Sequence, residues 1–230
     1  RYASIPGLTL EYQNYMMSCM GKNMGGLNAV LSWIYPERCA VCSRLVPVES
    51  FGGGLCPCCG KSPPFIKQPL CPVCGRHREE DPVCPACHNI QYAFERVYAV
   101  FDYETVKSSI RRFKYGGVKD TGRVFSGLMA RFAEENNLDF SGIDMIVPVP
   151  LHKNKQKSRG FNQSEIIAHE LGRCLGISVK PDVLVRIRET MPQSLVPSSE
   201  RRANVRGSFK VLDEAAVSGR GILLLDDIFT

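Results

Sequence analysis

Four Cys-x-x-Cys pairs, formed by eight of the eleven cysteines, constrain this chain more than any other feature of its sequence. Two intervening residues allow both thiolates of a pair to face one metal ion, and four thiolates fill a tetrahedral structural zinc site. Such a site has no position left for a reactive water. The pattern therefore predicts two structural Zn²⁺ ions and no zinc catalysis. The predicted ligands are Cys39, Cys42, Cys56, Cys59, Cys71, Cys74, Cys84 and Cys87.

Other uses of these cysteines fit the pattern less well. Disulfides form in oxidising compartments, for which the sequence offers no signal peptide. The ligands of an iron–sulfur cluster are usually closer together, and a redox-active motif would account for one pair of the four. We expect neighbouring pairs to share a metal ion, the first with the second and the third with the fourth, while the sequence leaves an interleaved arrangement open. Cys58 is expected to be spare, His77 and His88 to lie at the surface, and Cys174 to lie in the core.

The cysteine block defines the domain organisation. Residues 24–90 are interpreted as a double zinc ribbon that begins with a short amphipathic helix at 27–34. The block is rich in Pro and Gly, so metal binding must supply its folding free energy, about 10–16 kcal/mol per site. Residues 1–23 have no clear period and are expected to form a disordered tail, and residues 91–230 form a second domain. No run approaches the roughly 20 apolar residues of a membrane span, so a cytoplasmic protein without membrane insertion is expected.

The second domain alternates apolar strands with amphipathic helices. Strands are predicted at 97–103, 143–149, 179–187 and 222–225, and helices at 105–114, 120–135 and 161–175. This alternation predicts an α/β domain with a parallel sheet covered by helices on both faces. The last strand is an unbroken apolar run, which is typical of a strand buried on both faces. Thr105 is expected to cap the first helix, and Gly116 to end it.

Positive charge gathers in one region of the second domain. The chain has a net charge of +6, but residues 151–210 contain twelve Lys or Arg against five Asp or Glu, a local charge of +7. Four of these cations follow the strand at 143–149 and precede a helix. Loop amides, the helix dipole and the cations favour a polyanion there, either a small phosphate ligand or a nucleic acid. The four are Lys153, Lys155, Lys157 and Arg159.

Two adjacent acids, Asp226 and Asp227, follow the last predicted strand. The ligand crevice of an open α/β sheet lies beyond the carboxyl ends of its strands. Adjacent carboxylates at that position suit sugar hydroxyls or a hard cation such as Mg²⁺. On the pattern alone a solvated Asp-Asp turn would be the more common outcome, so the assignment depends on the surrounding motifs.

Those motifs resemble the ComF competence family, the phosphoribosyltransferase-like proteins that bacteria use in DNA uptake. The apolar strand followed by Asp226, Asp227 and Thr230 resembles the phosphoribosyl-pyrophosphate (PRPP) loop of type I phosphoribosyltransferases. The other segments that resemble ComF proteins are 112–116, 148–152, 159–163, 193–195, 201–202 and 204–209, together with the cysteine block. The resemblance extends over about residues 27–230.

The resemblance implies a parallel-sheet, type I phosphoribosyltransferase-like domain that binds PRPP with Mg²⁺. In such a domain Asp226, Asp227 and Thr230 would hold the ribose, and residues 190–206 would form a flexible loop over the ligand. The implied pyrophosphate loop contains Leu151, His152, Lys153 and Arg159, and the flexible loop brings Arg201 and Arg202 to phosphate. Because Thr230 is the first residue of the family's 5′-phosphate turn, the sequence is expected to be C-terminally truncated and inactive as given.

Two classes of function are compatible with these motifs. A phosphoribosyltransferase-like protein would act as a glycosyltransferase on PRPP, either in DNA uptake during natural transformation or in nucleotide salvage. A non-catalytic protein would bind single-stranded DNA, or dock onto other DNA-uptake proteins, and use PRPP only as a regulator. In that case Lys153, Lys155 and Lys157 are the candidate DNA contacts. The sequence does not decide whether PRPP is turned over or which base accepts the ribose.

Overall fold

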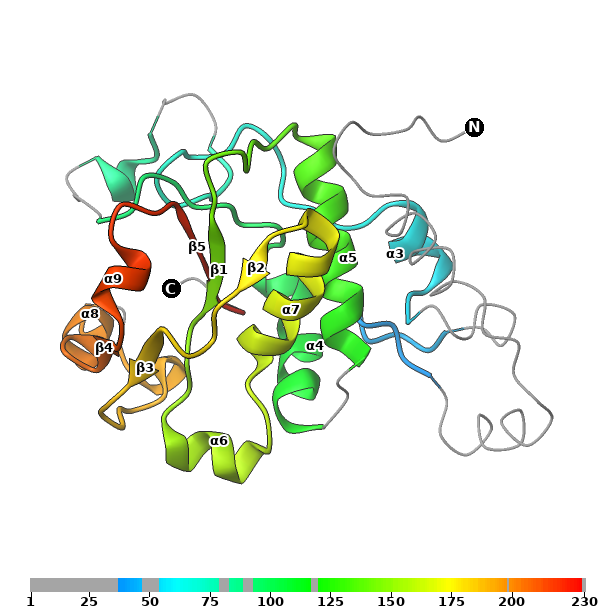
Figure 1. The fold of residues 1–230 in the computed structure, drawn as a ribbon. Coiled ribbons are helices and arrows are strands. Elements are labelled where there is room, and N and C mark those ends of the chain that lie inside the picture. The colour runs from blue at the N-terminus through cyan, green and yellow to red at the C-terminus, as the bar shows by residue number, and fades with distance from the viewer. Residues whose placement is uncertain are drawn as a thin grey trace.

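The computed structural model describes residues 37–46, 54–78, 83–88, 93–116, 120–197 and 199–228 (Figure 1). The tail predicted at 1–23, the helix predicted at 27–34 and Thr230 lie outside these residues, so those expectations stay predictions. A cysteine-rich region leads into an α/β region made of helices and short strands. No helix in the described ranges is long and apolar enough to cross a membrane.

The cysteine-rich region has little regular structure. It contains one short α-helix, α3 (Pro57–Lys61), and one 3-10 helix, η2 (Pro85–Cys87). Gly75, directly after a cysteine, has a φ of 70°, a backbone conformation that favours glycine. A Cβ at this position would lie 2.8 Å from the backbone nitrogen of Ala99. The turn that contains Cys74 and Gly75 therefore packs closely against the chain that enters the α/β region.

The prediction of a strand at 97–103 is wrong, because this segment joins no sheet in the part of the chain that the structure describes. Phe101 instead forms an isolated antiparallel bridge with Phe65 of the cysteine-rich region. The ring centroids of these two residues are 5.7 Å apart, and the amide of Ile66 donates to the carbonyl of Val100 (2.9 Å). The apolar pattern of the segment therefore marks a contact between the two regions.

Two helices follow, α4 (Tyr103–Tyr115) and α5 (Asp120–Glu135), close to where the sequence predicts them. The cap of α4 differs from the prediction. The carboxylate of Asp102 accepts a hydrogen bond from an amide of the first turn (3.0 Å), and Thr105 lies inside the helix. A carboxylate at this position also complements the positive end of the helix dipole. Gly116 ends the helix as expected.

Three parallel strands form the main sheet in the order β2–β1–β5, which confirms the predicted fold class. They are β1 (Met145–Pro148), β2 (Ser178–Val179) and β5 (Ile222–Leu225). Between β1 and β2 the chain forms two helices, α6 (Lys153–Arg159) and α7 (Gln163–Leu175). Helix α7 packs against β1 and β2 and, on its other side, against α5, so α7 covers one face of the sheet (Figure 1).

The opposite face of the sheet is open at β5 in the described chain. Leu225 is buried, whereas Ile222 is 37% and Leu224 57% exposed. Successive side chains of a strand point to opposite faces, and the described helices cover the face that carries Leu225. The prediction that residues 222–225 are buried on both faces is therefore wrong for the chain as described.

The strand predicted at 179–187 is split in two. Its first part is β2, and its second part belongs to an antiparallel hairpin that lies outside the main sheet. We call residues 184–211 the hairpin cap. The cap contains β3 (Leu184–Arg186), the 3-10 helix η3 (Gln193–Leu195), α8 (Arg201–Val205) and β4 (Phe209–Val211), and α9 (Glu214–Val217) then leads to β5.

Hydrogen bonds tie the hairpin cap together internally. One nitrogen of Arg188 donates to the carbonyls of Asn204 (3.2 Å) and Arg206 (2.7 Å), and the Asn204 side chain donates to the carbonyl of Met191 (2.9 Å). Residues 190–206, for which the resemblance implies a flexible loop, thus form two short helices held between two paired strands.

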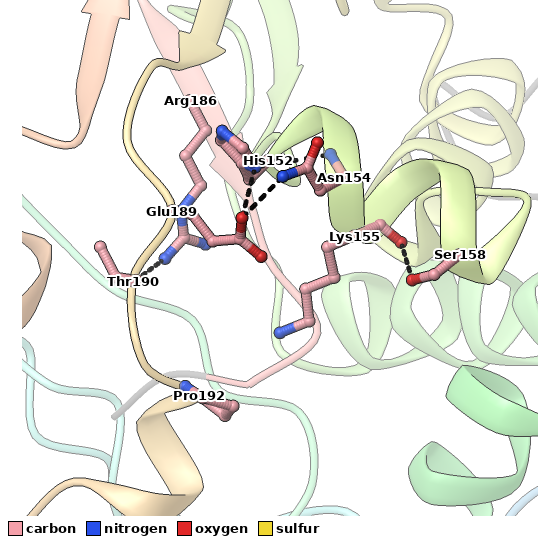
Figure 2. A pocket seen from close by; sticks show the side chains of 8 residues that line it. All are labelled: His152, Asn154, Lys155, Ser158, Arg186, Glu189, Thr190 and Pro192. Carbon is pink, nitrogen blue, oxygen red and sulfur yellow. Dashed lines mark hydrogen bonds and ion pairs between the residues drawn. The ribbon is translucent and has the colours of Figure 1, made fainter.

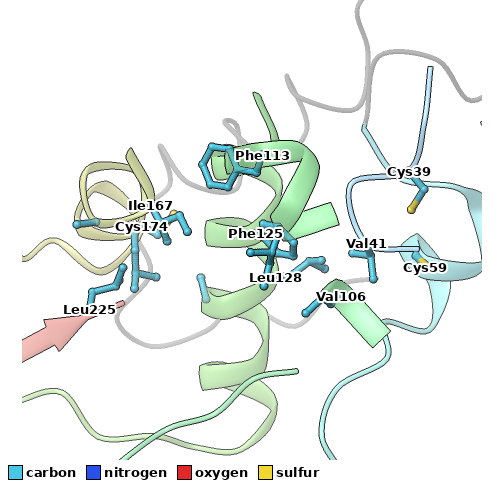
Figure 3. Close-up of a cluster of buried hydrophobic side chains, with 14 of the residues drawn as sticks. Cys39, Val41, Cys59, Val106, Phe113, Phe125, Leu128, Ile167, Cys174 and Leu225 are labelled. Carbon is cyan, nitrogen blue, oxygen red and sulfur yellow. The ribbon is translucent and has the colours of Figure 1, made fainter. Parts of the chain in front are cut away.

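One hydrophobic cluster extends from the first cysteine pairs to β5 (Figure 3). Inside it, the hydroxyl of Ser109 on α4 donates to the carbonyl of Val41 (2.8 Å). A Cβ on Gly54 would lie 2.7 Å from Val124 on α5, so the first ribbon also approaches that helix closely. The second group of cysteines forms a separate cluster with Val73 and Val83. The first ribbon is therefore part of the α/β core, and the second is not.

Candidate zinc centres and anion-binding site

The structure gathers the eight predicted zinc ligands into two groups of four. Within each group the sulfur atoms all lie within 4.8 Å of one another, with Cys42–Cys56 at 3.8 Å and Cys74–Cys84 at 3.6 Å. A tetrahedral site with Zn–S bonds of about 2.3 Å has sulfur–sulfur edges of about 3.8 Å, so the thiols fit zinc. The first group is Cys39, Cys42, Cys56 and Cys59, and the second is Cys71, Cys74, Cys84 and Cys87. The predicted sequential pairing is confirmed.

Four residues outside these groups lie where the sequence predicts them, namely Cys58, Cys174, His77 and His88. Cys58 is exposed and belongs to neither group. Cys174 is buried on α7. His77 and His88 are exposed, and the ring of His77 contacts the carbonyl of Lys67 (3.0 Å). Four thiolates in each group leave no place for a reactive water, which makes both centres structural.

One thiol of each group is more acidic than an ordinary cysteine. Burial alone raises the pKa of Cys56, but hydrogen bonds from the amide of Cys59 and from nearby thiols lower it to about 7. Burial likewise opposes the shift at Cys71, where backbone amides lower the pKa to about 6. Hydrogen bonds of this kind stabilise a thiolate, the form in which cysteine binds zinc.

The paired acids lie at the carboxyl end of β5, as predicted. One oxygen of Asp226 accepts hydrogen bonds from the hydroxyl of Ser164 in the first turn of α7 (3.0 Å) and from the amide of Asp227 (2.8 Å). Asp227 forms an ion pair with Lys114 near the end of α4 (2.5 Å), and these side chains are 12% and 19% exposed. Three elements, α4, α7 and β5, therefore position the two carboxylates.

Asp226 has a strongly shifted acidity. The residue keeps an exposed surface, but its carboxyl group is surrounded by protein, and the resulting loss of hydration raises its pKa to about 7. Repulsion from Asp227 adds to the shift, while the hydrogen bonds from the Asp227 amide and Ser164 and the charge of Lys114 oppose it. Asp226 thus exchanges a proton close to neutral pH.

This raised pKa links folding to pH, because the folded protein holds the Asp226 proton more tightly than the unfolded chain does. The stabilising contribution is present below the ordinary carboxyl pKa and is lost as pH rises through about 7. We therefore expect Asp226→Asn to be more stable than the wild type at pH 8, with a smaller gain at pH 6. Urea unfolding of both zinc-loaded proteins measures the difference. A gain that does not grow with pH would contradict the shifted pKa.

A cavity of about 400 Å³ lies beside α6 and faces the start of the hairpin cap (Figure 2). The segment after β1, predicted as a loop, contains this seven-residue helix, since the ring of His152 caps its first turn and Gly160 ends it in the left-handed conformation. The cavity is lined by His152, Asn154, Lys155, Ser158, Arg186, Glu189, Thr190 and Pro192.

Two half-buried cations, Lys155 and Arg186, make this cavity suitable for an anion. Burial lowers the pKa of Lys155, and the nearby charges of Arg159 and Arg186 lower it further. Burial also lowers the pKa of Arg186, whereas the charge of Asp226 raises it. The buried Nε of Arg186 has no hydrogen-bond partner among the described atoms. Neighbouring cations of this kind favour a negative charge between them.

The predicted pyrophosphate-loop residues are only partly brought together. His152 lines the cavity together with Lys155. Leu151 is half-buried and Lys153 is exposed, and neither belongs to the cavity wall. Lys157 is also exposed on α6. Helix formation explains this division, because neighbouring residues of a helix point in different directions.

The three arginines that the resemblance assigns to phosphate binding lie outside the cavity wall. The guanidinium of Arg159 stacks over the ring of Tyr115, 5.2 Å from its centre. Arg201 and Arg202 lie on α8, and Arg201 donates to the carbonyl of Val196 (3.1 Å). Their assignment to phosphate stays a prediction.

Four residues at this site have no role in the sequence-based assignment. They come from α4, α7, β3 and the segment after β3, so no local pattern joins them. The sequence contained a signal for one of them, because Lys114 falls within the segment 112–116 that resembles ComF proteins. The four are Lys114, Ser164, Arg186 and Glu189.

The fold and the two groups of cysteines define the class of this protein. It is a double zinc ribbon joined to an α/β domain with a parallel sheet, and the first zinc centre is part of the core of that domain. Residues 30–88 match the family described as a double zinc ribbon domain. The match covers both groups of cysteines.

Relatives of known name extend over most of the chain. It is 27% identical over 199 residues to the DNA utilization protein YhgH of Escherichia coli K12, across 85% of this chain and 86% of that protein. It is 26% identical over 200 residues to competence protein F of Haemophilus influenzae (84% and 85%). The identity to competence protein ComFC of Bacillus subtilis is 24% over 180 residues (70% and 66%). The chain is a homologue of these proteins, which confirms the resemblance seen in the motifs.

Proposed function

We propose that this protein binds PRPP between the paired acids and the cavity beside α6, and that it serves DNA uptake during natural transformation. The observation that carries the proposal is a convergence of opposite charges at the carboxyl ends of two neighbouring parallel strands. Asp226 and Asp227 follow β5 directly, and the chain that follows β1 supplies Lys155 to the adjoining cavity.

PRPP combines the two kinds of group that this arrangement suits. Ribose hydroxyls donate hydrogen bonds, and Asp226 and Asp227 offer carboxylate oxygens to accept them. Pyrophosphate is a polyanion, and Lys155 and Arg186 are cations that lack a neutralising partner in the cavity wall other than Glu189. A bound Mg²⁺ would neutralise pyrophosphate further, and Asp226 and Asp227 are candidate carboxylate ligands for it.

The biological half of the proposal rests on the relatives. Two are named competence protein F and ComFC, and another is named DNA utilization protein YhgH. In this setting PRPP serves either as the substrate of a glycosyltransferase or as a regulator of DNA handling. Nucleotide salvage is the alternative setting for the same ligand.

Single-stranded DNA is a second candidate ligand, favoured by the outer side of α6. Lys153 and Lys157 are exposed there, and Tyr115 is 74% exposed with Arg159 stacked on it. Cations track a phosphate backbone, and stacking of a base on an aromatic ring contributes about 1–3 kcal/mol. Docking onto other DNA-uptake proteins has no comparable observation in its favour.

Calorimetric titration of the zinc-loaded protein with PRPP and Mg²⁺ tests the main proposal. Asp226→Asn should weaken binding by about 10- to 100-fold, because a hydrogen bond to a charged group contributes roughly 1.5–3 kcal/mol. The control is Glu134→Gln, an exposed acid at the far end of α5, which should bind as the wild type does. If PRPP does not bind while labelled oligo-dT binds and Tyr115→Ala releases it, single-stranded DNA replaces PRPP as the assigned ligand.

A further inference from the structure

Glu189, in the hairpin cap, is the one acidic residue that lines the described cavity. One of its carboxylate oxygens accepts a hydrogen bond from the side-chain amide of Asn154 (2.8 Å) and lies 3.5 Å from the Nδ1 atom of His152. Figure 2 shows the carboxylate between Arg186 of β3 and the start of α6. An anionic group of the protein thus lies within a cavity whose other charged residues are cations.

These contacts join the hairpin cap to the start of α6. The cap is held by its own bonds, in which Arg188 and Asn204 connect its two ends. Within the described chain, the strongest packing of β3 against any helix or strand is with β4, inside the cap. Glu189 therefore connects the cap to α6 across the cavity mouth.

A carboxylate and a phosphate group require the same surroundings. Both accept hydrogen bonds from amide donors, and both are attracted to lysine and arginine. A pyrophosphate in this cavity would use the amide donor that Glu189 engages, together with Lys155 and Arg186. Glu189 would also repel such a ligand as long as it stays in place.

We propose that Glu189 is a built-in competitor and latch, which holds the hairpin cap closed on α6 until a pyrophosphate group displaces it. This inference rests on the proposed function and adds regulation to the same site. The side chain is 59% exposed, so its bonds are of the weak, exchangeable kind seen for exposed ion pairs. Once Glu189 is displaced, the cap contacts the ligand through Arg186, which lines the same cavity.

Titration of the full zinc-loaded chain with inorganic pyrophosphate tests the competition. Glu189→Gln keeps an oxygen that accepts the hydrogen bond from Asn154 but removes the charge, and it should bind pyrophosphate about 3- to 10-fold more tightly, as expected for one exposed charge contact with a multivalent anion. The gain should shrink at high salt, which screens exposed charges. Lys155→Gln should weaken binding, and Glu134→Gln should leave it unchanged.

Trypsin cleavage after Arg188 gives a second reading that needs no ligand. Asn154→Ala should speed this cleavage, because it removes the hydrogen bond of the latch and leaves both residues of the cleaved bond unchanged. If the wild type binds pyrophosphate and Glu189→Gln binds it equally or more weakly, the competition is overturned while the proposed ligand stands. If neither protein binds pyrophosphate, the proposed ligand fails, and the latch then stands only if cleavage of Asn154→Ala is faster than that of the wild type.

Discussion

Replacing Cys39 with serine is expected to unfold the α/β domain together with the first ribbon, whereas Cys71→Ser should leave that domain folded. Cys39 is fully buried in the same cluster as Ile110 of α4 and Phe125 of α5. A structural zinc centre contributes about 10–16 kcal/mol, and the total stability of a domain is about 5–15 kcal/mol. Loss of the first centre therefore removes the surface on which both helices pack.

Zinc analysis and thermal unfolding separate the two variants. Each should retain one zinc per chain, but only Cys39→Ser should lose the main cooperative transition. Cys71 packs with Val73 and Val83 in the separate cluster, so its loss should shift that transition by a few degrees at most, roughly the effect of 1 kcal/mol on a domain of this size. Cys58→Ser is the matched control, with two zincs and an unchanged transition. Equal shifts for the two ligand variants would show that the centres contribute alike.

Lys114→Met is expected to lower the free energy of unfolding by about 2–3 kcal/mol, because it leaves the Asp227 carboxylate largely buried without its partner. The estimate lies below the value for a fully buried pair, since the two side chains are 19% and 12% exposed. Adding Asp227→Asn to the same chain should recover most of the loss, as expected when both members of a buried pair are neutral.

Urea unfolding of the wild type, the two single variants and the double variant measures this coupling. Lys107→Met on the same helix is the control, because its ion pair with Glu104 is exposed on both sides and should change stability little. A cost for Lys114→Met no greater than that of the control would mean that α4 does not hold the acid pair.

Features encoded by neighbouring residues were predicted well. Helix α5 covers Asp120–Glu135 and β5 covers Ile222–Leu225, as the apolar patterns indicate. The segment 97–103 was mistaken for a strand of the sheet because an aromatic and β-branched run looks the same whichever partner it pairs with. Its partner, Phe65, lies in the cysteine-rich region.

Metal chemistry follows from spacing alone, since two residues between cysteines place both sulfurs near one ion in almost any fold. The position of Asp226 and Asp227 at a strand end is equally local. Which centre belongs to the core, and which side chains surround the acids, depends on how distant segments pack. Ser164 and Asp226 are 62 positions apart in the sequence yet share a hydrogen bond. Lys114 reaches Asp227 from α4, which packs on both the first ribbon and α5. No periodicity of the sequence predicts such long-range contacts, because they depend on how the helices and strands pack in the core.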